Sequence, residues 1–168
     1  MKRIGLLFVA VLTINFAFAQ DAETYFANGE KLKQSEDYKG AKEAYSKTIE
    51  LDPSNVNAFL QRAFCNSLLG DYEASIADYT KVIAIKPDHK YSYLTRGSAR
   101  NKLKKYNEAI SDFDKVISLD PDNQEAYNNR GWAKKGLGDS DGACKDWNKS
   151  KKLGNDEAKI ILRNNKCR

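Results

Sequence analysis

The hydrophobic positions of this chain recur with a period of 34 residues. Aromatic residues occupy the fourth, seventeenth and twenty-fourth places of four successive segments, 22–55, 56–89, 90–123 and 124–157, with Ser140 as the one exception. Polar turns such as LLGDY and KGLGDS lie near the middle of a segment, and the prolines of LDP, IKP and LDP close the first three segments. Each segment is therefore predicted to form a helix, a tight turn, a second helix and a closing turn.

Two further places in the repeat hold small residues. The eighth place holds Gly29, Ala63, Gly97 and Gly131, and the twentieth holds Ala41, Ser75, Ala109 and Ala143. Small residues allow two helices to approach closely, while the aromatic residues fill the gaps beside them. The two helices of each segment are therefore expected to pack as a hairpin.

This pattern resembles the tetratricopeptide repeat (TPR), a 34-residue helical hairpin with small residues at places eight and twenty and proline at place thirty-two. The resemblance implies an all-α fold, a right-handed solenoid of four hairpins. Residues from 156 onward are expected to form a capping helix, with 158–168 beyond the last repeat, in which Ile160, Ile161 and Leu162 cover the open end. The family also implies a concave groove, lined by the first helices, that takes up a peptide or a segment of a partner protein.

One charged pair recurs in the repeats. Arginine stands at place seven and aspartate at place twenty-three of the last three repeats, whereas the first repeat has Asn28 and Ala44. An ion pair between the two helices of each hairpin is expected, with a structural role.

Residues 1–19 have the layout of a signal peptide. Lys2 and Arg3 precede an apolar stretch that ends in Ala17-Phe18-Ala19, and this stretch is shorter than the roughly 20 residues of a spanning helix. Cleavage after Ala19 is expected, with an uncleaved membrane anchor as the alternative. The mature protein is then exported, periplasmic or secreted, with no transmembrane segment.

Composition and charge exclude several classes of function. Of 28 basic residues, 26 remain after cleavage against 23 acidic ones, a balance too mild to indicate nucleic-acid binding. No cofactor or metal site is expected, because the chain has a single histidine, His89, which lies in a turn. No Ser or Cys motif with the spacing of a catalytic triad accompanies it, so the protein is predicted not to be an enzyme.

A set of residues on the non-core face of the first helices makes up the candidate ligand-binding groove. The helical period places an apolar and aromatic stripe, flanked by amides, on this face. The alternative is that some of these side chains pack against the neighbouring repeat. The set comprises Phe26, Leu60, Phe64, Tyr91, Leu94, Asn101, Asn128 and Trp132.

Three cysteines remain to be assigned. If the last helix of the fourth repeat and the capping helix run antiparallel about Gly154-Asn155, Cys144 lies beside Cys167. A disulfide between them is predicted, with two unpaired thiols as the alternative, and Cys65 is expected to be a buried thiol.

These observations predict a protein–protein interaction module, an adaptor or assembly scaffold of the cell envelope. Its partner is a protein or peptide whose identity the sequence does not give. The alternative is a structural protein that self-associates, or binds an anionic surface through its basic C-terminal end. In that end, residues 149–168, seven basic residues stand against two acidic ones.

Overall fold

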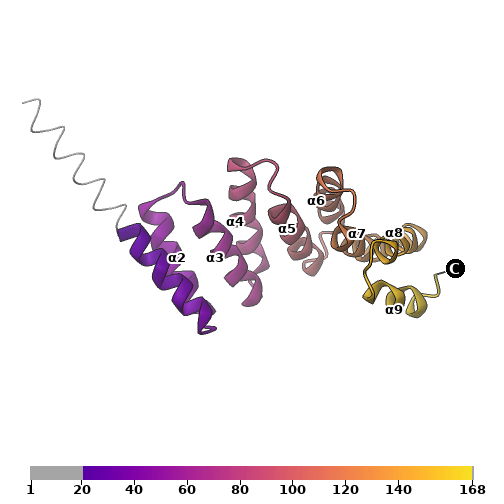
Figure 1. Ribbon diagram of the computed structural model, residues 1–168, viewed down its shortest axis with the longest axis horizontal. Coiled ribbons are helices and arrows are strands. Elements are labelled where there is room, and N and C mark those ends of the chain that lie inside the picture. Colours follow the sequence, from indigo (N-terminus) through magenta and orange to yellow (C-terminus); the bar gives the residue numbers. More distant parts are fainter. Residues whose placement is uncertain (1–20, 168) are drawn as a thin grey trace, which may run out of the picture. The chain divides into compact units, whose positions relative to one another are not determined.

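The computed structural model describes residues 21–167, and the regular secondary structure in this range is entirely helical (Figure 1). The predicted signal peptide lies outside the described residues. None of the helices in the described range is both long and apolar enough to span a membrane.

The chain divides into two compact units after Asp71. The described part of the N-terminal unit contains a helix over residues 21–34, α2 (Tyr38–Leu51) and α3 (Val56–Leu68). The C-terminal unit contains α4 (Tyr72–Ile85), α5 (Lys90–Lys102), α6 (Tyr106–Leu119), α7 (Gln124–Gly136), α8 (Ser140–Lys152) and α9 (Glu157–Asn164). Consecutive helices from α4 to α9 that are joined by a turn pack on one another (Figure 1). The predicted all-α architecture of paired helices is confirmed.

The last place of the repeat caps the helix that follows it. The side chains of Asn55 and Asn123 accept hydrogen bonds from the backbone N–H groups of Ala58 and Ala126, and they begin α3 and α7. His89 does the same for α5, where its Nδ1 accepts the N–H of Ser92 at 3.3 Å. The single histidine therefore has a structural role, as a capping residue.

This cap should make the stability of the fold depend on pH. Burial, and secondarily the charge of Lys86, hold the pKa of His89 below its ordinary value of 6.5. As the pH falls below 6.5, His89 takes up a proton more readily in the unfolded chain than in the folded one. The contribution of the cap to stability is therefore lost as the pH falls further, through the lowered pKa of the folded state. We expect His89→Asn, which supplies the cap of the other repeats, to lose less unfolding free energy than the wild type between about pH 7.5 and pH 5. Urea denaturation at the two pH values measures the loss of unfolding free energy. An equal loss in both proteins would contradict the capping role of His89.

The aromatic residue at place twenty-four fills the space left by the small residue at place eight. Tyr45, Phe113 and Trp147 are almost fully buried. A Cβ built on Gly29 would lie 2.6 Å from the Tyr45 ring, one on Gly97 2.7 Å from Phe113, and one on Gly131 2.5 Å from Trp147. A side chain at these three positions would have to displace the ring, because the ring occupies the volume of the missing Cβ.

The predicted ion pairs are present in the C-terminal unit. Arg96 pairs with the buried Asp112, and Arg130 with the buried Asp146, each at 2.7 Å. Each arginine also donates to place twenty-five of the preceding repeat, Arg96 to Thr80 and Arg130 to Asp114. The pairs therefore bind the hairpin together and also join it to its neighbour.

The aromatic residue at place four lies beside the same arginine in the third and fourth repeats. The guanidinium groups of Arg96 and Arg130 lie 5.4 and 5.3 Å from the ring centroids of Tyr93 and Tyr127. The first repeat has Asn28 in place of the arginine, and Tyr25, expected in the core, is 42% exposed. The exposed ring of Tyr25 thus coincides with the repeat that lacks the arginine.

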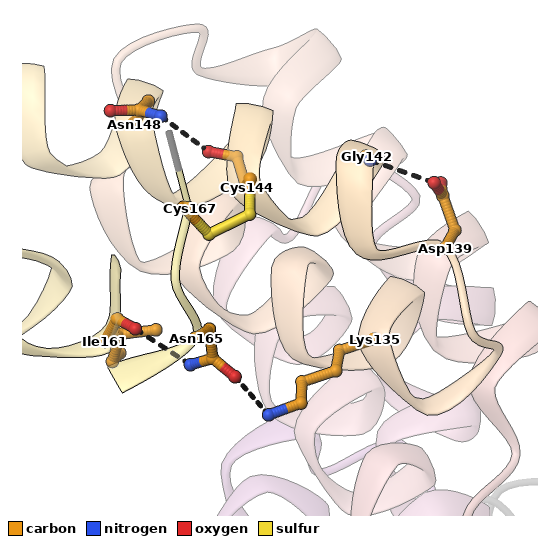
Figure 2. Close-up of a disulfide and its surroundings, with 8 residues drawn as sticks. All are labelled: Lys135, Asp139, Gly142, Cys144, Asn148, Ile161, Asn165 and Cys167. Carbon is orange, nitrogen blue, oxygen red and sulfur yellow. Dashed lines mark hydrogen bonds between the residues drawn. A yellow bond between two sulfur atoms is a disulfide. The ribbon is translucent and has the colours of Figure 1, made fainter. Parts of the chain in front are cut away.

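A disulfide joins Cys144 of α8 to Cys167, which follows α9, with their Cα atoms 5.5 Å apart (Figure 2). It is the predicted pair, and Cys65 is a free, buried thiol. Ile161 and Leu162 of α9 pack against Trp147, as expected of a capping helix, but Ile160 is 53% exposed and faces solvent. A hydrogen bond from Lys135 of α7 to Asn165 also holds the end of α9 (Figure 2).

Candidate functional site

The predicted groove residues of the N-terminal unit are partly covered. Phe26, Leu60 and Phe64 are all half-buried. The Phe26 ring packs against Tyr45, with 5.6 Å between the ring centroids. Phe26 thus contributes to the core of its unit as well as to the predicted face.

The polar groups on this face of the N-terminal unit bond to one another. The Tyr45 hydroxyl donates to Glu30 at 2.6 Å, and Lys33 donates to Glu30 at 2.8 Å and to Gln61 at 2.9 Å. Burial raises the pKa of Tyr45, and its bond to the Glu30 carboxylate raises it further. Burial alone would raise the pKa of Glu30, but the bonds from Lys33 and Tyr45 lower it overall. This closed network leaves little for a ligand to satisfy.

Two predicted groove residues of the C-terminal unit are buried, which corrects their assignment to an open face. Leu94 is 9% exposed and packs in the core cluster that contains Phe113 and Ala126. Asn128 is 7% exposed, on the first helix of the following hairpin. The helical period of α5 or α7, taken alone, places these two residues outside the hairpin core. They are buried because α7 packs against α5.

Two predicted aromatic residues remain exposed in this unit. Tyr91 is 49% exposed, and its ring meets Tyr79 edge-on at 6.3 Å. Trp132 is 41% exposed, and its ring meets the buried Trp147 edge-on at 5.1 Å. Trp132 is therefore anchored at one side while a large part of its indole is open to solvent.

Trp132 lies in the wall of a cavity of about 380 Å³ that brings together three of the predicted residues. Asn101 of α5, and Asn128 and Trp132 of α7, line it. The other lining residues are Ser98 and Lys102 of α5, Asn129 of α7 and Glu157, the first residue of α9. This cavity is the candidate functional site, and it lies entirely within the C-terminal unit.

The amides in this cavity are incompletely bonded. Asn101 Nδ2 donates to the carbonyl of Asn129 at 2.9 Å, and Asn129 Nδ2 donates to Ser98 Oγ at 3.3 Å. The buried Oδ1 atoms of Asn101 and Asn128 have no hydrogen-bond partner among residues 21–167. A buried acceptor without a partner costs free energy, so these two amides are incompletely satisfied within their unit.

Sequence reasoning did not include Asn129 or Glu157 in this site. Asn129 stands at place six, which the helical period does not assign to the candidate face, and Glu157 belongs to the capping helix rather than to a first helix. The capping role of α9 was the only signal that could have placed Glu157 beside the last repeat.

Comparison with known protein families gives three matches over this chain. A "TPR repeat" family matches residues 97–138, and two "Tetratricopeptide repeat" families match residues 44–77 and 22–55. Together the matches cover more than half of the chain. No curated protein matches the sequence.

Solved structures share the fold. The MamA protein superposes with a TM-score of 0.76 at 24% identity, over 83% of this chain and 76% of that one. The first TPR of Spaghetti (RPAP3), bound to the HSP90 peptide SRMEEVD, gives a TM-score of 0.66 at 28% identity. The match covers 71% of this chain and 95% of that one. The Arabidopsis OM64 TPR domain gives a TM-score of 0.64 at 26% identity. The match covers 70% of this chain and 98% of that one.

The family matches, the 34-residue period and the paired helices agree with one another. The chain belongs to the tetratricopeptide repeat family.

Proposed function

We propose that this protein is a non-catalytic interaction module that binds a segment of a partner protein in the cavity between α5, α7 and α9. The observation that carries the proposal is the exposed Trp132 indole beside two buried amide oxygens without partners. An anchored aromatic surface next to unsatisfied polar groups is typical of a site that is completed by a ligand.

The structural relatives support a peptide as the ligand class. The Spaghetti TPR was solved with the bound peptide SRMEEVD, in which three of the last four residues are acidic. In this chain the places that would hold such a carboxylate carry Phe26 and Glu30, Gln61, and Tyr91 and Thr95, which lack cationic side chains. The proposed ligand is therefore a peptide segment, but not an acidic tail.

The proposed location is the cell envelope. The signal-like residues 1–19 support export, and a disulfide suits an oxidising compartment. The module would then act as an adaptor or assembly scaffold outside the cytoplasm.

Selection from a random peptide display library tests the proposed function. We expect the wild-type protein to enrich a family of related peptides, and Trp132→Ala to bind them at least 30-fold more weakly, as for a central aromatic anchor. Ile160→Ala is the matched control, because it removes an exposed apolar side chain from α9 that does not line the cavity. Thermal melts followed by circular dichroism verify that both variants are folded. Enriched peptides that bind wild type and Trp132→Ala equally would contradict the proposal.

A second candidate function rests on the basic C-terminal end. The last turn of α8 contains Lys149, Lys151 and Lys152, and exposed Lys159 and Arg163 lie on α9. Such a surface could serve self-association or attachment to an anionic surface. Measuring binding at increasing salt concentration distinguishes the two candidate functions. Charge-driven attachment weakens steeply as the ionic strength rises, whereas binding at Trp132 changes little.

A further inference from the structure

We propose that the first hairpin, formed by the helix over residues 21–34 and α2, carries a second binding site, which takes a helix of a partner protein. That helix has an apolar side, and the turn after its last residue contains a carboxylate. The site lies in the N-terminal unit and shares no residue with the cavity that contains Trp132. The inference follows from what covers the equivalent face of the third and fourth hairpins.

A cavity of about 490 Å³ is lined by both helices of the first hairpin. Tyr25 and Leu32 of the first helix and Ala44 of α2 give it apolar walls. Tyr25 is 42% exposed, whereas Tyr93 and Tyr127, at the same place of the third and fourth repeats, are half-buried. The first hairpin therefore exposes apolar surface that the later hairpins cover.

The later hairpins are covered by the second helix of the preceding repeat and by the turn that closes that repeat. α4 packs against α5, and α6 packs against α7. In the turn after α4, Asp88 pairs with Lys115 of the next repeat at 3.0 Å. In the turn after α6, Asp122 pairs with Lys149 at 3.7 Å. A helix with an acidic closing turn is thus the element that covers this face in the C-terminal unit.

The first hairpin has the same receiving groups. Lys47 stands at the place of Lys115 and Lys149, and it lines the cavity together with Tyr25. No helix precedes this hairpin within the part of the chain that the structure describes. Lys47 pairs instead with Glu50 of its own helix at 2.7 Å, and both side chains are exposed. Exchanging this partner for a carboxylate of the ligand therefore costs little.

The other charges in the cavity wall offset one another. Lys42 and Glu43 are the remaining charged residues of the lining, and Lys42 also lies 3.8 Å from Asp71. Lys47 therefore leaves the wall with a net positive charge, which favours an acidic turn. α9 of a second copy does not fit this face, because the turn after α9 contains Lys166 and no acidic residue.

A synthetic peptide of residues 106–123 tests the inference, because it contains α6 and the closing turn that cover the fourth hairpin. An isolated helix of this length is marginal in water, so the peptide is stapled through Asn107 and Ser111, on the exposed side of α6. Binding to the ¹⁵N-labelled full chain is followed by NMR. We expect saturable binding, with amide shifts confined to residues 21–34 and α2. Absence of binding, or shifts at the Trp132 cavity, would overturn the inference.

A charge exchange tests the role of Lys47. Lys47→Glu should weaken the binding of the peptide at least fivefold. A peptide with Asp122→Lys should bind the Lys47→Glu protein more tightly than it binds the wild type. Lys31→Glu is the matched control, because it makes the same change at an exposed position of the first helix that does not line the cavity. Equal binding of the unaltered peptide to the wild type and to a folded Lys47→Glu protein would count against the inference.

Two other occupants of this face would give different results. A dimer in sedimentation velocity that Lys47→Glu dissociates would assign the face to a second copy of the chain. Peptide binding by the chain that begins at Gln20, but not by the full chain, would assign the face to residues 1–19. Either result would overturn the inference, and neither bears on the proposed function of the Trp132 cavity.

Discussion

Replacing Gly97 by leucine is expected to lower the free energy of unfolding by about 3 kcal/mol. Even a single Cβ at this position would lie 2.7 Å from the Phe113 ring, and that ring is fully buried between α5 and α6. The ring cannot withdraw without opening the core cluster that it forms with Ala109 and Val116. Urea denaturation followed by helical circular dichroism measures the loss.

Ala77→Leu is the matched control for this change. Ala77 lies on the exposed side of α4, so an added leucine should alter the unfolding free energy by less than about 0.5 kcal/mol. Equal denaturation midpoints for Gly97→Leu and Ala77→Leu would contradict both the close helix crossing and the repeat frame that places glycine there.

Removing the disulfide is expected to have an effect of similar size. The bond between Cys144 and Cys167 closes a loop with a sequence separation of 23 residues, for which the loop-entropy relation gives about 3 kcal/mol. It also holds α9 over Trp147 and fixes the helix that places Glu157 in the cavity wall. The paired change Cys144→Ser with Cys167→Ser should lower the unfolding free energy by this amount.

Reductant supplies the control for the disulfide. Dithiothreitol should shift the urea midpoint of the wild type to that of the double variant and leave the double variant unaffected. Mass spectrometry of the unreduced protein should show the linked peptide. A wild-type midpoint that reductant does not change, or three cysteines open to alkylation without it, would contradict the account.

The architecture could be predicted because the same packing constraint recurs in several repeats. Gly29, Gly97 and Gly131 stand opposite Tyr45, Phe113 and Trp147 at a constant distance along the chain, and each pair lies in contact. The disulfide could be predicted for a different reason: an antiparallel return of the chain about Gly154 fixes which residues of the two helices are neighbours.

The candidate site could be predicted only in part, because a helical period describes one helix at a time. It separates the two faces of α5, but it does not show that α7 covers Leu94 or that Asn128 becomes buried. Which amide atoms remain without partners depends on distances of a few tenths of an ångström between side chains. The exposure of Trp132 followed from the pattern, whereas the bonding of Asn101 and Asn128 did not.

Mapping the contact surface of a library-selected peptide tests the central claim most directly. A ¹H–¹⁵N NMR titration of the ¹⁵N-labelled protein with such a peptide reports which amides change. The account predicts the largest shifts at Ser98, Asn101 and Lys102 of α5, at Asn128 to Trp132 of α7 and at Glu157. Shifts confined to the basic residues of α8 and α9, with Trp132 unperturbed, would contradict it.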